Sequence, residues 1–94
     1  MASVEQKHYN IMVTGLVHGV FFRASAKQMA DLLNVKGFVR NEPQSDVYIE
    51  AEGDEAVLVK FIQWCHHGPD RAEVKYVSVN EGKFQGFEGF EVRR

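Results

Sequence analysis

The chain has a single cysteine, Cys65, and it lacks long hydrophobic runs. One cysteine cannot form a disulfide within the chain, and one cysteine with four histidines is a poor ligand set for a structural zinc module. No apolar run approaches the roughly 20 residues that cross a bilayer, and residues 1–9 lack the apolar stretch of a secretory signal. These absences predict a soluble, cytoplasmic protein that has no membrane partner.

The chain also lacks an excess of charge of one sign. Its 11 lysine and arginine residues are balanced by 13 aspartate and glutamate residues, which gives a formal net charge of −2. A protein that attracts nucleic acid or an anionic membrane electrostatically needs a basic surface. We therefore expect no nucleic-acid partner, and a site for an anionic ligand has to be built from local groups.

Length and composition predict one domain that covers residues 1–94. Hydrophobic residues make up 45% of the chain, and neither a low-complexity segment nor an internal repeat is visible. A chain of this size buries about 60–68% of its unfolded surface, which is enough for a core without disulfides or metals. We expect a monomer in which residues 1–7 form a flexible N-terminal extension.

The spacing of apolar residues predicts both strands and helices. Tyr9, Ile11 and Val13 alternate with polar residues, as in a strand with one covered face. From Phe22 onward, apolar residues recur every three or four positions, which is typical of an amphipathic helix, and Asn34 or Gly37 can end it. The further elements expected are a strand from residue 35 or 36 to 41, a strand at 47–52 that completes a hairpin, a helix capped by Asp54 and ended by Gly68-Pro69, a strand at about 72–80 with a bulge, and a short strand at 87–92.

This order, β-α-β-β-α-β with a terminal strand, predicts an α+β, ferredoxin-like fold. The expected sheet is mainly antiparallel, with the core order 4-1-3-2 plus the short terminal strand, and both helices pack on one face. The first and second strands then run parallel with the third between them, so their carboxyl ends lie at the same edge. Two interstrand steps, roughly 10 Å, separate Asn41 at the end of the second strand from the loop after the first.

That loop, Gly15-Leu16-Val17-His18-Gly19-Val20-Phe21-Phe22-Arg23, has the features of an anion site. Its glycines let the backbone curl so that successive N–H groups converge, and the following helix adds its positive end. The Arg23 guanidinium matches two phosphate oxygens at once. Because Asn41 lies at the same edge of the sheet, we expect Arg23 and Asn41 to face one phosphate-binding pocket.

These groups favour hydrolysis of an activated phosphate. Phosphoryl transfer passes through a loose transition state, so positioning a water molecule and neutralising the phosphoryl oxygens supply most of the acceleration. No general acid is evident near the loop, and a carboxylate leaving group, as in an acyl phosphate, needs none. A Walker loop is excluded because Val20 and Phe21 follow Gly19, and a cysteine-dependent phosphatase loop is excluded because Val17 occupies the thiolate position.

Two segments of the chain resemble the acylphosphatase family. The family's Val-x-Gly-Val-x-Phe-Arg motif matches Val17-His18-Gly19-Val20-Phe21-Phe22-Arg23. A second stretch of the family matches Gly37-Phe38-Val39-Arg40-Asn41. The resemblance spans nearly the whole chain. It implies a hydrolase that uses no metal and no cofactor, takes a small acyl phosphate, and releases a carboxylate and inorganic phosphate, which we expect to inhibit competitively. The site residues implied are Arg23 for substrate binding, Asn41 for orienting the attacking water, main-chain amides of Leu16, Val17, His18, Gly19, Val20, Phe21 and Phe22 as the phosphate cradle, and Gly15 as a structural residue.

The chain departs from the family at two positions. His18 stands where relatives usually have glutamine, and Phe38 stands where they often have tryptophan. His18 adds a titratable group beside the cradle. We expect it to be a loop residue exposed to water rather than a catalytic base.

Three alternatives have less support in the sequence. Cys65-His66-His67 looks like a metal-ligand cluster, but adjacent helical residues point about 100° apart, and Cys65 fits the buried stripe of its helix. Lys36-Gly37-Phe38-Val39 resembles part of an RNA-binding motif whose further aromatic residues are missing here. A non-catalytic ferredoxin-like module that binds phosphate or carbamoyl phosphate is the main alternative to an enzyme.

Overall fold

The computed structural model describes residues 5–19, 21–44 and 46–93, and within them it has five strands and two helices. The predicted order of elements is confirmed. Neither helix in these ranges is long and apolar enough to cross a membrane. In chain order the elements are β1 (Gln6–Leu16), α1 (Phe22–Leu33), β2 (Lys36–Asn41), β3 (Val47–Asp54), α2 (Glu55–His67), β4 (Glu73–Glu81) and β5 (Phe90–Val92).

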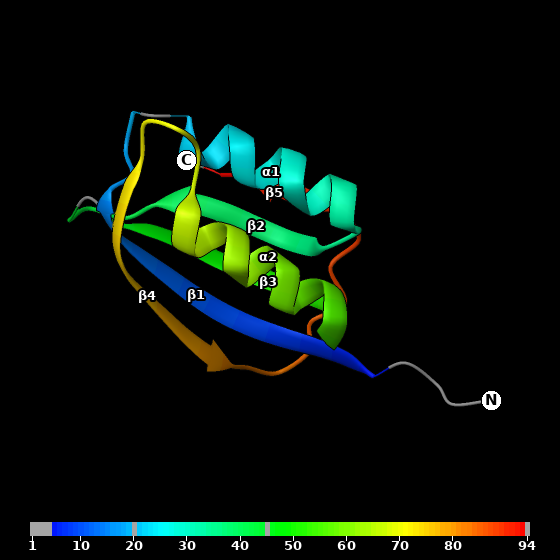
Figure 1. Cartoon of the computed structure of the whole chain (residues 1–94). Helices are drawn as coiled ribbons and strands as arrows, with labels where there is room; N and C mark the ends of the chain where they lie inside the picture. The colour runs from blue at the N-terminus through cyan, green and yellow to red at the C-terminus, as the bar shows by residue number, and fades with distance from the viewer. Residues whose placement is uncertain (1–4, 20, 45, 94) are drawn as a thin grey trace.

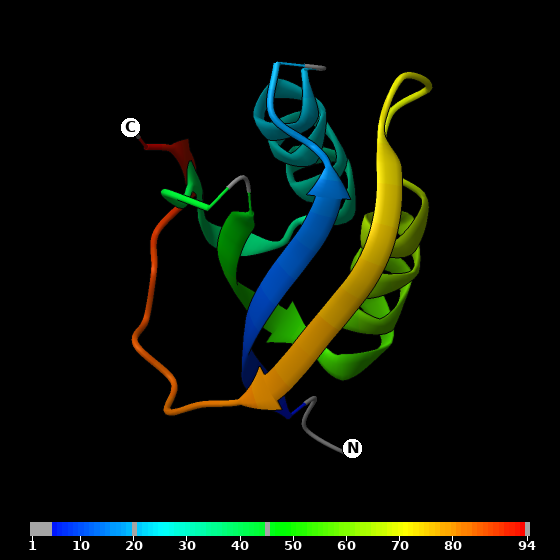
Figure 2. The same cartoon turned by 90° about the vertical axis from the view of Figure 1, so that its left-hand side faces the viewer.

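The strands form one sheet in the order β4-β1-β3-β2-β5. The pairs β1–β3, β1–β4 and β2–β3 are antiparallel, whereas β5 runs parallel to β2. Both helices cover the same face of the sheet (Figure 1), and the long β4–β5 connection runs from one edge strand to the other (Figure 2). The ferredoxin-like α+β fold and the core order 4-1-3-2 are therefore confirmed, with the terminal strand added beside β2.

The position of β3 determines where the ends of its neighbours lie. Because β3 is antiparallel to both β1 and β2, those two strands run parallel and end on the same side of the sheet. Leu16 ends β1 there and Asn41 ends β2. The loop after β1 and the end of β2 are thus brought together by the pairing of a third strand.

One hydrophobic core lies between the sheet and the helices. Alternate residues of β1 and β3, such as Ile11, Val13 and Ile49, face the helices and are fully buried. Burying a side chain of this size contributes about 1.5–3 kcal/mol relative to exposure. The helices contribute Phe22, Ala26, Ala30, Leu58, Phe61 and Cys65 to the same core.

The first strand begins earlier than the sequence predicts. Gln6 and Lys7 belong to β1, where they pair with Asp54 and Gly53, so these two residues are not part of a flexible extension. Residues 1–4 lie outside the described residues. Asp54 occupies the N-cap position of α2 as predicted, but its carboxylate accepts a hydrogen bond from the Gln6 side chain and makes none to the helix. The long partner strand β3 explains both differences, since it extends to Asp54.

The ends of two other elements can also be compared with the prediction. Asn34 ends α1 in the left-handed conformation, with φ at 61°, and its N–H donates to the Ala30 and Asp31 carbonyls. Of the two residues predicted to end this helix, Asn34 is therefore the one that does so. The last strand is shorter than predicted, because only Phe90–Val92 pairs with β2.

The Cys65-His66-His67 run does not form a cluster of converging ligands. Cys65 is fully buried in the core, and burial raises the pKa of its thiol, whereas His66 and His67 are exposed. Among the described residues, no group of three or more His, Cys, Asp or Glu side chains is placed to hold a metal ion. Cys65 is a core residue, as its position in the apolar stripe predicts.

The β4–β5 connection is held to the sheet by Glu52, a carboxylate that is 1% exposed. Its Oε1 accepts main-chain N–H bonds from Gly86 and Phe87 at 3.0 Å each, and its Oε2 accepts one from Gln85. The Nδ1–H of His8 donates to Oε2 at 2.6 Å. Glu52 therefore determines the path of the chain from β4 to β5, the strand that borders the site described below.

We expect Glu52→Gln to destabilise the protein at neutral pH, because the amide cannot replace a carboxylate that accepts four hydrogen bonds. Burial raises the pKa of Glu52, but its main-chain donors and His8 outweigh burial and hold the pKa below its ordinary value. A carboxyl whose pKa is lower in the folded than in the unfolded chain adds stability above the unfolded pKa and loses it as pH falls through the folded one.

The expected loss in the free energy of unfolding at pH 7 is about 1–3 kcal/mol. Urea unfolding at pH 7 and at about pH 3 measures it, and the difference between the variant and the wild type should shrink at the lower pH. Glu88→Gln, at an exposed position of the same connection, is the control. An equal difference at both pH values would contradict a stabilising charge on Glu52.

Candidate active site

A β-bulge redirects the chain at the end of β1. The register between β1 and β4 shifts after Thr14, so that Thr14 faces Tyr76 while Gly15 faces Val74. Gly15 has φ at 138°, and a Cβ built there would lie 2.1 Å from the Glu73 carbonyl oxygen. The bulge predicted for the fourth strand is thus confirmed, and Gly15 is a strand residue at that bulge rather than a loop residue. Only glycine allows β4 to approach so closely.

Helix α1 begins at a strained residue. Phe21, its N-cap, has φ at 63°, a left-handed conformation that costs a non-glycine residue on the order of 1–3 kcal/mol. Its carbonyl accepts the Ser25 N–H at 2.9 Å, while its side chain offers no oxygen to cap the helix. Phe22 anchors the first turn, because it is buried and its ring packs against Trp64 at a centroid distance of 5.2 Å. The first N–H groups of α1 are therefore left for another acceptor.

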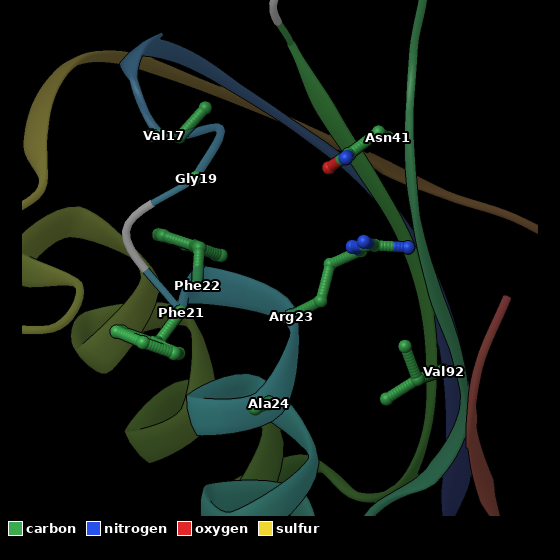
Figure 3. A pocket seen from close by; sticks show the side chains of 8 residues that line it. All are labelled: Val17, Gly19, Phe21, Phe22, Arg23, Ala24, Asn41 and Val92. Atoms are coloured by element: carbon green, nitrogen blue, oxygen red, sulfur yellow. The ribbon is translucent and has the colours of Figure 1, made fainter. Parts of the chain in front are cut away.

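A pocket of about 300 Å³ opens between this helix start and the end of β2. Arg23 extends from the first turn of α1 and Asn41 projects from the end of β2 into the same space (Figure 3). The two residues are 18 positions apart in the chain, and the sheet brings them together. Among the described residues, those that line it are Val17, Gly19, Phe21, Phe22, Arg23, Ala24, Asn41 and Val92.

The other residues of the predicted cradle are distributed differently. Four of them line the pocket: Val17, Gly19, Phe21 and Phe22. Leu16 does not line the pocket; it is the last residue of β1, and its side chain is exposed. His18 is not exposed to water as predicted: it is half-buried and points to the β2–β3 turn, where its Nε2 lies 2.7 Å from the Asp46 carbonyl oxygen. Val20 lies outside the described residues.

The Arg23 side chain is held by a main-chain carbonyl directly after β5. Its Nη1 donates to the main-chain carbonyl of Arg93 at 3.0 Å, and the Arg93 N–H donates to the Val39 carbonyl at 2.8 Å. The guanidinium of Arg93 lies 4.0 Å from the centroid of the Phe38 ring on the sheet. A neutral carbonyl fixes the direction of the Arg23 guanidinium without neutralising its charge, so the charge stays available to an anion.

Asn41 is held by the hairpin that follows it. It pairs with Val47, and the next residue, Glu42, donates its N–H to the Asp46 carbonyl at 2.8 Å. Within the described parts of the chain, the Asn41 amide makes no side-chain hydrogen bond and is not a buried unsatisfied group. An amide in this state can both donate to and accept from a water molecule or a ligand.

In a comparison with known proteins, the acylphosphatase family model matches residues 9–92 of this chain. The chain belongs to the acylphosphatase family. An acylphosphatase of Nocardioides sp. is 46% identical over 84 residues, which are 89% of this chain and 85% of that protein. The solved acylphosphatase of Coxiella burnetii is 30% identical with a TM-score of 0.93, covering 99% of this chain and 100% of the other. That of Bacillus subtilis is 32% identical with a TM-score of 0.91, covering 94% and 99%.

These likenesses extend over nearly the whole chain. They confirm the predictions of the family, of the ferredoxin-like fold and of an acylphosphatase enzyme. Membership of the family implies a small acyl phosphate as substrate.

Three residues around the acylphosphatase pocket were missed by sequence reasoning. Ala24 and Val92 line it, and the Arg93 carbonyl holds Arg23. Val92 and Arg93 reach the site only because β5 pairs with β2. No local pattern marks them, although Ala24 could have been found as the neighbour of Arg23 in the first turn of a helix that is predicted to bind an anion.

Proposed function

We propose that this acylphosphatase hydrolyses the carboxyl–phosphate bond of acyl phosphates by direct attack of water on phosphorus. Arg23 and main-chain N–H groups of the β1–α1 loop hold the phosphoryl group, and Asn41 orients the water. The observation that carries the proposal is that Arg23 and Asn41 line one pocket of about 300 Å³. The oxygen of the water forms the new bond to phosphorus, the bond from phosphorus to the acyl oxygen breaks, and the electron pair leaves with the carboxylate.

Three kinds of group bind the phosphoryl dianion in this proposal. The loop through Gly19 and the start of α1 supply main-chain donors, and the helix adds the positive end of its dipole. No acidic residue lies in the first turn of α1 to oppose an anion there. The Arg23 guanidinium contributes the full positive charge. Such preorganised donors stabilise the charge on the phosphoryl oxygens in the transition state without reorganising.

The lining of the pocket supports an activated substrate. Of the described residues that line it, Arg23 and Asn41 have polar side chains. Neither is an acid that would protonate an alkoxide leaving group, whereas a carboxylate departs without protonation. The Asn41 amide oxygen accepts a hydrogen bond from the water, which directs a lone pair of the water oxygen toward phosphorus, opposite the leaving oxygen.

The proposal also includes two properties of the protein as a whole. The protein acts as a monomer. Inorganic phosphate has the same anionic oxygens as the bound substrate and inhibits competitively.

Hydrolysis of benzoyl phosphate in the presence of excess EDTA tests this function. We expect steady turnover that EDTA does not reduce, together with competitive inhibition by phosphate. Binding of phosphate without turnover would instead identify a non-catalytic binding module. Loss of turnover on chelation would identify a metal-dependent phosphatase, which the proposal excludes.

A further inference from the structure

His18 joins two parts of the site that are 28 residues apart. Its Nε2 lies 2.7 Å from the main-chain carbonyl oxygen of Asp46. A carbonyl oxygen only accepts, so Nε2 carries the hydrogen. The same oxygen accepts the Glu42 N–H at 2.8 Å, which is the bond that closes the hairpin directly after Asn41. One carbonyl therefore connects the β1–α1 loop to the residue next to Asn41.

Among the described residues, no other hydrogen bond joins this loop to that hairpin. Gly19 follows His18 with φ at 69°, and a Cβ built on it would meet nothing within 4 Å. Phe21, beyond it, is 77% exposed. Val17 and Phe22 are both buried, so the core anchors the two ends of the turn, and His18 lies next to the first of them. Gly19 lies exposed between these anchors, and glycine gives the backbone a wide choice of conformations unless a neighbouring side chain restrains it.

We propose that His18 is a positioning residue: its Nε2–H fixes the distance between the phosphate-binding loop and the Asn41 hairpin. The proposal rests on the function proposed above and goes deeper into it. A phosphoryl group held by the loop and a water held by Asn41 react only at a defined separation, and a misplacement of about 1 Å can cost about 100-fold in rate. The hydrogen bond from His18 spans the two sides of this separation.

The same geometry argues against a role as catalytic base. The nitrogen that faces the rest of the protein is used by the Asp46 carbonyl, and His18 is not among the residues that line the pocket. What the site needs from His18 is an N–H donor at one position. Glutamine offers an amide N–H of similar reach and cannot act as a base, so the two roles can be separated by substitution.

The kinetic test compares His18→Ala with His18→Gln on benzoyl phosphate. We expect the alanine variant to lose about 10-fold or more in kcat while the phosphate inhibition constant changes less, because Arg23 and α1 are untouched. We expect the glutamine variant to stay within about three-fold of the wild type. His66→Gln, an exposed histidine of α2, is the control. Equal losses in the alanine and glutamine variants, or wild-type kcat in the alanine variant, would overturn the proposal.

A second measurement uses the unchanged protein and does not depend on turnover. The nitrogen NMR shifts of the His18 ring report which nitrogen carries the hydrogen in the neutral form. We expect the Nε2–H form with a ring N–H proton that exchanges slowly with water, because the Asp46 carbonyl accepts it. A ring without this contact also favours Nε2–H but exchanges the proton rapidly, so rapid exchange would overturn the contact. The Nδ1–H form would overturn the contact with Asp46 even if the enzyme is active. If the wild type fails to hydrolyse benzoyl phosphate while the slowly exchanging Nε2–H is observed, the proposed reaction fails and the contact between loop and hairpin stands.

Discussion

Replacing Arg23 with alanine is expected to lower kcat/KM for benzoyl phosphate by at least 100-fold. The guanidinium is held in the pocket by the Arg93 carbonyl at 3.0 Å, so its direction is set before substrate arrives. Removing one preorganised donor to a charge that develops in the transition state costs about 2.7–4 kcal/mol, which corresponds to roughly 100- to 1000-fold in rate. Initial rates at substrate concentrations below KM give the ratio directly.

Two further variants make this prediction specific. Arg23→Lys keeps the positive charge but lacks the planar fork, so its kcat/KM should fall between those of the wild type and Arg23→Ala. Arg71→Ala removes an exposed arginine that does not line the pocket and should leave kcat/KM unchanged. Unfolding in urea checks that each variant is folded. Turnover by Arg23→Ala close to that of the wild type would rule out the proposed phosphoryl site.

The second large effect is expected at Asn41, where alanine should lower kcat by about 100-fold while inhibition by phosphate stays nearly the same. In the proposed reaction Asn41 contacts the attacking water, and the loop and Arg23 bind the anion. Loss of the amide therefore leaves the phosphoryl group bound but the nucleophile without orientation. The measurement is kcat together with the inhibition constant of phosphate, determined for the same variant.

The matched control for Asn41 is Asn80→Ala, at an exposed position of β4 that does not line the pocket. Asn41→Asp provides a second comparison, because a carboxylate there would repel the dianion and should weaken phosphate inhibition as well as turnover. If Asn41→Ala weakened phosphate inhibition as much as it lowered kcat, Asn41 would be a ligand of the anion rather than the residue that orients water.

Local patterns in the sequence predicted much of the fold. The alternation around Ile11 predicted β1, and the three- and four-residue spacing from Phe22 predicted α1. Both patterns repeat over neighbouring residues, so no knowledge of distant contacts is needed. The bulge beside Gly15 was also predictable, because the apolar residues of the fourth strand change phase near that point. The start of β1 at Gln6 was not, since it depends on the length of its partner β3.

Part of the candidate site was also predictable from the sequence, and part of it was not. The glycines, the helix start and Arg23 lie within nine consecutive residues, so the sequence alone indicates an anion-binding loop. Its distance to Asn41 follows from strand order, which the element order predicts for a ferredoxin-like sheet. The direction of the His18 side chain did not follow, because a loop residue beside a glycine has no periodic pattern that sets its orientation.

By itself, the sequence determined the order of the elements and the family, and it indicated the segment proposed to bind the anion, because each of these depends on residues that are close along the chain. Only the tertiary structure decided how the side chains of the site are held. The Arg93 carbonyl contacts Arg23 across 70 positions, the Asp46 carbonyl contacts His18 across 28, and Glu52 binds Gln85 across 33. Contacts of this kind form when separate strands are packed side by side, and no pattern local to either partner encodes them.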